Sequence, residues 1–126
     1  MPLLAGIPSQ TQAARLVQHL HGSFVQGQDW RLCASTAPTE PSFDPVRYWR
    51  GPIWANLNWM LHHGLRRYGF EQEAEKLKQD TLDLLSEGGL FEYFNPKPGN
   101  PKGLGSDNFS WSAALALDLI RNPTPL

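Results

Sequence analysis

Two short segments of the chain combine flat aromatic rings with a single carboxylate. The first reads YWRGPIW and contains Tyr48, Trp49, Arg50 and Trp54, and the second reads GGLFEYFNP and contains Glu92. The C–H face of a pyranose packs well on an indole ring, while its hydroxyl groups need a few placed hydrogen-bond donors and acceptors. This combination of residues favours a sugar site.

Hydrolysis of a glycosidic bond requires a pair of carboxylates, one acting as acid and one as base or nucleophile. Glu92 is one candidate, although a glutamate in a turn is more often simply exposed to solvent. Asp44 and Asp107 are the other acids near these segments. Asp44 precedes Pro45 as turn-forming residues do, and Asp107 stands where a helix N-cap is expected, so both are predicted to be structural. If the chain is catalytic alone, Asp44 is its best candidate general acid.

The composition excludes several classes of partner. The 126 residues carry a net charge of −1 with acids and bases mixed, so neither nucleic acid nor a membrane is an expected partner. Without a signal sequence or a membrane span, the chain is expected to be cytoplasmic. A lone Cys33 is interpreted as a half-buried thiol. The adjacent His62 and His63 diverge on a helix and are expected to be surface or hydrogen-bonded residues, so no metal site is predicted. The glycines around Lys102 lack the Gly-Lys-Ser/Thr order of a phosphate loop, so no cofactor is predicted.

Hydrophobic periodicity predicts an all-α chain with four helices. The first follows a capping box at Ser9, and the second begins at Pro52 and stops at Gly69. The third spans about 71–87, and the fourth, capped by Asp107, is apolar on nearly every side and is therefore predicted to be buried all round. Trp59 and Trp111 are assigned to the core.

The alternation of amphipathic and more buried helices is typical of concentric helix rings. The connections over 22–51 and 88–106 are much longer than usual, and each leads into the start of a more buried helix. Both are therefore expected to lie at the same end of the assembly. They also hold the aromatic and acidic residues, so that end is the expected position of the site.

Three spaced motifs over about Leu3 to Ile120 resemble glycoside hydrolase family 63-like enzymes, most closely the mannosylglycerate and glucosylglycerate hydrolases, and at lower strength trehalases and processing α-glucosidases. They read YWRGPIWANLNW from Tyr48, EYFNP from Glu92 and FSWSAA from Phe109. The resemblance implies an (α/α)6 barrel that hydrolyses an α-glycosidic bond with inversion. It maps the general base onto Glu92.

The same resemblance maps the lining of the sugar subsite onto Tyr48, Trp49 and Trp54, with Arg50 as a polar or anion contact. The family's general acid lies in an earlier helical hairpin, outside the matched residues. Twelve helices of average length need about 130 to 140 residues before any loop is counted, which exceeds this chain.

Residues 1–126 are therefore expected to be the C-terminal portion of such a catalytic domain, with about two helical hairpins and long loops at one end of a partial barrel. The expected partners are a small carbohydrate substrate and either the missing N-terminal hairpins or another copy of the chain. A fragment of this kind is expected to be inactive alone and to expose the apolar fourth helix. The alternative interpretation is a non-catalytic helical module that binds a sugar or a protein.

Overall fold

The computed structural model describes residues 1–24, 32–96 and 103–121. The chain is mostly helical, as predicted, with one small antiparallel sheet. In chain order the elements are α1 (Pro2–Ala5), α2 (Gln10–His19), the π-helical turn η1 (Leu20–Phe24), the 3-10 turn η2 (Tyr48–Arg50), α3 (Ala55–Arg67), α4 (Glu71–Gly88), β1 (Tyr93–Phe94), β2 (Gly103–Leu104) and α5 (Ser110–Arg121). Within these ranges no helix has the length and apolar character needed to cross a bilayer.

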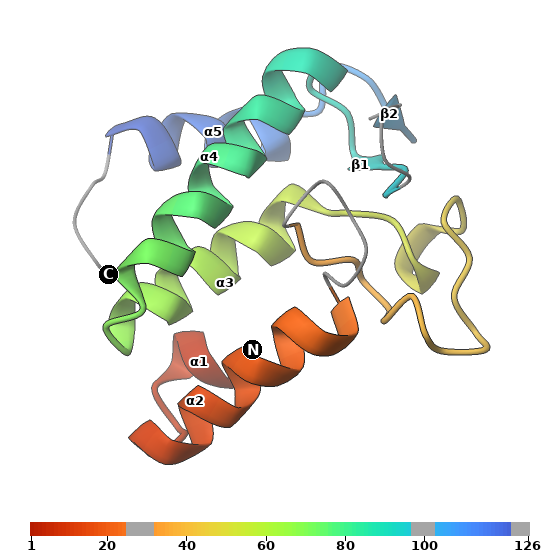
Figure 1. Ribbon diagram of the computed structural model, residues 1–126. Helices are drawn as coiled ribbons and strands as arrows, with labels where there is room; N and C mark the ends of the chain where they lie inside the picture. The colour runs from red at the N-terminus through yellow and green to blue at the C-terminus, as the bar shows by residue number, and fades with distance from the viewer. Residues whose placement is uncertain (25–31, 97–102, 122–126) are drawn as a thin grey trace.

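Helices α3 and α4 form the central hairpin and lie side by side across the molecule (Figure 1). The turn between them places Gly69 at φ 78°, in the left-handed region that favours glycine. Two acids, Glu71 and Glu73, stand in the first turn of α4, where they complement the helix dipole. The predicted third helix is confirmed.

Helix α1 packs directly on α3, and α2 follows it after a tight turn (Figure 1). A Cβ atom on Gly64 would lie 2.7 Å from Leu3 Cβ, so glycine at this position lets the two helices approach closely. The capping box at Ser9 is confirmed: its hydroxyl accepts from the Gln12 N–H at 3.3 Å, while Gln12 Oε1 accepts from the Ser9 N–H at 2.8 Å.

Helix α3 begins three residues later than the sequence predicts. Pro52 and Ile53 are not helical, and Trp54, with φ −118° and ψ 130°, takes the N-cap position. The backbone of Ile53 exchanges two hydrogen bonds of 2.9 Å with Phe94. A helix beginning at Pro52 would break this pairing, which explains why the local preference of proline for a first turn does not decide the boundary.

Asn58 joins α3 to the segment that begins at Leu32. It is completely buried; its Oδ1 accepts from the Cys33 N–H at 2.8 Å, and its Nδ2 donates to the Cys33 carbonyl at 3.1 Å. The same amide nitrogen lies 3.0 Å from the Trp54 carbonyl. Cys33 is buried rather than half-buried, and burial raises the pKa of its thiol to about 12. The hydrophobic core therefore extends from the hairpin to the long first loop.

Helix α5 is not buried all round. Only Ser112 and Leu119 are buried, and Trp111 is 48% exposed, so its assignment to the core is wrong. Trp59 is only partly buried. The exposed apolar residues follow one stripe of α5 and are Trp111, Leu117 and Ile120. Helix α5 begins at Ser110, three residues after Asp107, so Asp107 does not stand at the position directly before the helix, where an N-cap residue belongs.

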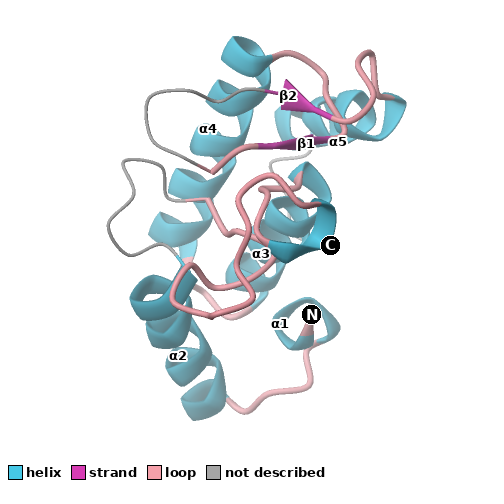
Figure 2. Cartoon of the chain, turned by 90° about the vertical axis from the view of Figure 1, so that its right-hand side faces the viewer, coloured by secondary structure: helices cyan, strands magenta, loops and turns pink. Residues whose placement is uncertain are grey.

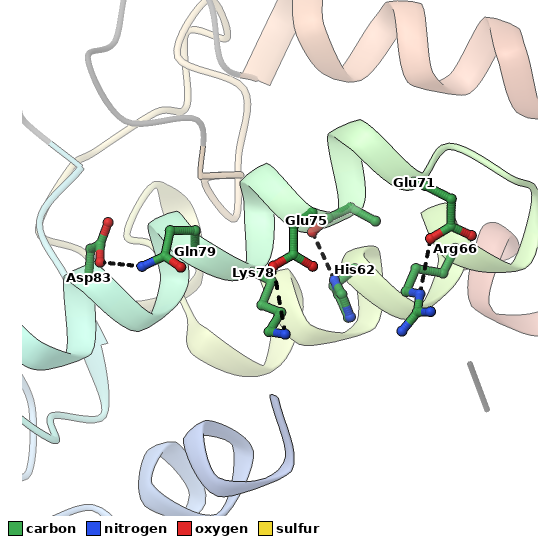
Figure 3. Close-up of polar contacts among 8 residues, drawn as sticks. His62, Arg66, Glu71, Glu75, Lys78, Gln79 and Asp83 are labelled. Atoms are coloured by element: carbon green, nitrogen blue, oxygen red, sulfur yellow. Dashed lines mark hydrogen bonds and ion pairs between the residues drawn. The ribbon is translucent and has the colours of Figure 1, made fainter. Parts of the chain in front are cut away.

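Charged side chains along the hairpin pair mainly with near neighbours (Figure 3). Arg66 Nε lies 3.2 Å from Glu71 Oε2, and Lys78 Nζ lies 3.7 Å from Glu75 Oε1. In both pairs the glutamate is exposed to solvent, so each contributes at most about 1 kcal/mol. His62 differs, because its Nδ1 lies 2.8 Å from the Ala74 carbonyl of α4 in a buried position. This contact links the two helices inside the hairpin.

Candidate active site

The two long connections meet at one end of the hairpin, as predicted. Ile53 forms isolated antiparallel bridges with Ala34 on one side and with Phe94 on the other. Phe94 belongs to β1, which pairs with β2. Figure 2 shows the loop that precedes α3 lying in front of that helix, with the two strands above it. The aromatic segment and the acidic turn are thus held against each other by backbone hydrogen bonds.

Glu92 stands immediately before β1 and is partly buried. Its Oε1 accepts a hydrogen bond from the Tyr48 hydroxyl at 3.3 Å, and its Oε2 accepts one from the Ser106 N–H at 3.4 Å. The Glu92 N–H in turn donates to the Ser106 carbonyl at 3.0 Å. The carboxylate therefore has one neutral donor on each oxygen, which fixes its plane and leaves a further lone pair on each oxygen.

Tyr48 adopts a backbone conformation that bulky residues rarely use, with φ 38°. A residue in this region costs on the order of 1–3 kcal/mol, which the surrounding contacts must offset. One such contact is the hydrogen bond from Trp54 Nε1 to the Tyr48 carbonyl at 3.2 Å. Desolvation and the negative charge of Glu92 raise the pKa of the Tyr48 hydroxyl, so the hydroxyl remains a hydrogen-bond donor at neutral pH.

The rings of Tyr48, Trp49, Trp54 and Tyr93 form one cluster, which includes the tyrosine that donates to Glu92. Trp49 and Trp54 are stacked with centroids 3.8 Å apart, and Trp54 and Tyr93 are stacked at 5.0 Å. Trp54 is only 2% exposed, because Trp49 and Tyr93 cover it, whereas Trp49 is 43% exposed and Tyr48 is 50% exposed. Of these rings, Trp49 and Tyr48 therefore carry the open surface, and Tyr48 is the one in direct contact with Glu92. A direct sugar contact from Trp54 stays a prediction.

Arg50 and Asp44 shape the loop that carries these rings. Arg50 Nε donates to the Ser42 carbonyl at 3.2 Å, while the residue as a whole is exposed. Asp44 Oδ1 accepts from the Val46 N–H at 3.1 Å, which confirms Asp44 as a turn-forming residue. The contact of Arg50 with substrate stays a prediction.

Sequence reasoning missed the polar residues that hold the acidic turn. Ser112, buried in α5, donates from Oγ to the Phe91 carbonyl at 2.6 Å. A serine inside an otherwise apolar helix is the only local signal of this contact, since such a hydroxyl needs a partner. Ser106 was also missed, because its role depends on the pairing of β1 with β2, which no local pattern encodes.

A second group of polar residues joins α3 to α5, away from these loops. Asp118 Oδ2 accepts from Trp59 Nε1 at 2.6 Å and lies 3.4 Å from His63 Nε2. His62 and His63 are both buried rather than at the surface, and desolvation lowers the pKa of each. Across the three described ranges, no group of three or more His, Cys, Asp or Glu side chains is arranged to hold a metal ion.

A carboxylate and open aromatic rings on the loops at one end of a helical hairpin form the kind of site that a helical glycoside hydrolase carries. The chain belongs to the family of the mannosylglycerate hydrolase MGH1-like glycoside hydrolase domain, whose model matches residues 1–112.

Similar proteins agree with this assignment. The chain is 48% identical over 118 residues to a mannosylglycerate hydrolase of Thermus thermophilus, covering 93% of this chain and 27% of that protein. It is 55% identical over 78 residues to a mannosylglycerate hydrolase of Rubrobacter radiotolerans, covering 62% of this chain and 17% of that protein. The crystal structure of a family 63 mannosylglycerate hydrolase from another strain of Thermus thermophilus, in complex with glucose, superposes with a TM-score of 0.86 at 46% identity, covering 95% of this chain and 29% of that one. The chain thus has the fold of part of an (α/α)6 barrel and spans about a quarter of the length of these relatives.

Proposed function

We propose that this chain supplies the general-base half of an inverting glycoside hydrolase that cleaves the α-glycosidic bond of a small glucosyl or mannosyl compound. The observation that carries the proposal is the position of Glu92, whose carboxylate accepts from the Tyr48 hydroxyl beside the exposed ring of Trp49. In this role Glu92 removes a proton from a water molecule as that water attacks the anomeric carbon. The names of the similar enzymes support a mannosyl or glucosyl group as the glycone.

The aromatic residues have distinct parts in this proposal. Trp49 and Tyr48 present open ring surface on which the apolar face of a pyranose can rest. Trp54 supports Trp49 from behind by stacking and holds the Tyr48 carbonyl, and it contacts the sugar through the small part of its ring that is open. Arg50 contributes an exposed positive charge at the rim, suited to an anionic aglycone such as glycerate.

The general acid comes from a part of the fold that this chain does not span. In an inverting enzyme the acid and base carboxyl groups stand about 6.5–9.5 Å apart, on opposite sides of the scissile bond. Asp44 and Asp107 do not supply an obvious acid: Asp44 is engaged in its own turn, and Asp107 is exposed after β2. The partner in this proposal is therefore a polypeptide with the remaining helical hairpins of the family, or a second copy of the chain, in the same cellular compartment, expected to be the cytoplasm.

Reconstitution tests the proposal. The 126-residue chain is mixed with the Thermus thermophilus enzyme from which the matching segment has been removed, and release of mannose from mannosylglycerate is measured. We expect no activity from either part alone and activity from the mixture. Activity of the chain alone that survives Glu92→Gln and further purification would contradict both the missing acid and the role of Glu92.

The alternative function is a non-catalytic sugar-binding module, favoured by the open ring of Trp49. Titration of the chain alone with mannose, glucose and glycerate, followed by tryptophan fluorescence, separates the two. Binding of a sugar together with failure of every reconstitution mixture would favour the module. Reconstituted turnover would favour the enzyme.

A further inference from the structure

The backbone around Glu92 is held from a single later segment of the chain. The Phe109 N–H donates to the Leu90 carbonyl at 2.7 Å, and the Ser112 hydroxyl donates to the Phe91 carbonyl at 2.6 Å. The Glu92 N–H donates to the Ser106 carbonyl at 3.0 Å. Three consecutive residues of the acidic turn are therefore fixed by the segment that runs from the end of β2 into α5.

The side chain of Glu92 depends on the same segment. Its Oε2 accepts from the Ser106 N–H, and this oxygen lies over Gly105. A Cβ atom on Gly105 would stand 2.6 Å from Glu92 Oε2 and 2.8 Å from the ring of Tyr93, closer than atoms can approach. Gly105 also has φ 74°, in the left-handed region. A side chain at this position would therefore displace the Glu92 carboxylate, and the backbone conformation also favours glycine.

We propose that Gly105 and Ser106 are positioning residues for Glu92, with the Ser106 N–H holding Oε2 and Gly105 leaving the space that this oxygen occupies. The inference rests on the proposed function, in which Glu92 is the general base. A base must be held within about 0.5 Å of its productive position, because small displacements sharply reduce proton transfer. Tyr48 fixes the other oxygen, so the carboxylate is clamped between one side-chain donor and one backbone donor.

The first test uses nuclear magnetic resonance on the full 126-residue chain labelled with ¹⁵N and ¹³C. The side-chain carboxyl of Glu92 and the backbone amide of Ser106 are followed together as the pH is lowered. We expect the Ser106 amide to shift with the same midpoint as the Glu92 carboxyl, and this shift to vanish in Glu92→Gln. A Ser106 amide that stays constant while Glu92 titrates would overturn the proposal.

The second test separates the contact from the strained backbone. Gly105→Ala places a methyl group against Glu92 Oε2. Gly69 has a similar φ of 78°, but Gly69→Ala adds a methyl group with no atom within 4 Å of it. We expect Gly105→Ala to uncouple the Ser106 amide from the titration of Glu92 and Gly69→Ala to keep the coupling. Retained coupling in folded Gly105→Ala would overturn the role of Gly105. If that variant does not fold, the comparison of the unaltered chain with Glu92→Gln still decides the role of Ser106.

Kinetics of the reconstituted enzyme distinguish failure of this inference from failure of the proposed function. If Glu92 is the base and is held as described, Gly105→Ala lowers kcat at least about 10-fold with little change in KM and moves the acid limb of the pH profile, whereas Gly69→Ala does neither. Loss of the coupling with unchanged kcat would reject Glu92 as the base and leave its positioning intact. Absence of the coupling in the unaltered chain would reject the positioning, whatever the activity.

Discussion

The indole rings of Trp49 and Trp54 are nearly parallel, with an interplanar angle of 4° and centroids 3.8 Å apart. One of the pair is exposed and the other is buried. Because Trp54 also stacks on Tyr93, the three rings form a continuous stack that ends at an open face of Trp49. The rigid stack gives the loop a flat surface without requiring a deep pocket.

Substitutions in this stack are predicted to separate binding from stability. Trp54→Ala should lower the free energy of unfolding by about 3–5 kcal/mol, as expected for a large buried ring, and also raise KM. Trp49→Ala should cost only about 1 kcal/mol, as for one aromatic pair, yet raise KM in the reconstituted enzyme at least as much. Urea unfolding and steady-state kinetics measure the two effects. A larger stability loss in Trp49→Ala than in Trp54→Ala would contradict the assignment.

Replacement of Glu92 by Gln is predicted to affect the chemical step. Gln keeps the shape and much of the hydrogen bonding but cannot take a proton, so kcat of the reconstituted enzyme should fall by about 10² to 10⁴ with KM little changed. Glu87→Gln, at an exposed position of α4, serves as the matched control and should retain activity. Near-normal kcat in Glu92→Gln, with loss of activity in Asp44→Asn or Asp107→Asn, would show that the base was assigned to the wrong carboxylate.

The buried histidines predict a fall in stability on the acid side of neutrality. Desolvation lowers the pKa of His62 and of His63 below the value of about 6.5 that each has in the unfolded chain. The unfolded state then binds more protons than the folded state, so this stability is present above about pH 6.5 and is lost as the pH falls below it. Denaturant unfolding between about pH 7.5 and pH 5 measures the slope.

A variant at an exposed position provides the control for this pH dependence. His21 lies at the surface, so His21→Gln should retain the full slope, whereas His63→Gln should reduce it. Stability that is constant, or that rises, as the pH is lowered through this range would contradict the predicted protonation of the histidines.

The exposed stripe of α5 predicts self-association of the isolated chain. Apolar surface of this kind is usually covered in a stable protein, so Leu117→Glu and Ile120→Glu should each shift the chain towards a monomer in size-exclusion chromatography. Ile7→Glu alters an apolar residue that is even more exposed but lies outside the stripe, and it should leave the elution unchanged. A sharp monomer of the unaltered chain with a cooperative melt would favour the self-sufficient module.

The parts of the fold that follow from local sequence were predictable. The capping box at Ser9 and the α3–α4 hairpin depend on spacing within one or two turns, so periodicity found them. The start of α3 was not predictable in this way, because the pairing of Ile53 with Phe94 is a long-range contact. Helix α5 is apolar on nearly every side in sequence, but among the described residues its stripe, which includes Trp111, is left about half exposed.

The candidate site was predictable to the extent that a motif marks it. The carboxylate and the aromatic segment were found from residue types, and the structure brings Glu92 and Tyr48 into contact. The residues that position Glu92 were not predicted. Gly105 contributes only the absence of a side chain and Ser106 only a backbone N–H, and neither property is visible in the residue type. The burial of Trp54 could not be predicted either, because an aromatic motif does not show which of its rings are covered by others.

The two hydrogen bonds between Ile53 and Phe94 also have a consequence for the order of folding. The α3–α4 hairpin is built from contacts close in sequence and can form quickly, whereas the pairing of Ile53 with Phe94 closes a longer loop at a higher entropic cost. The acidic turn and the aromatic segment should therefore meet only in a late step. A nascent or partly unfolded chain would have its helices, but its acidic turn and aromatic segment would not yet be in contact. Such a chain would therefore not bind a sugar until folding is complete.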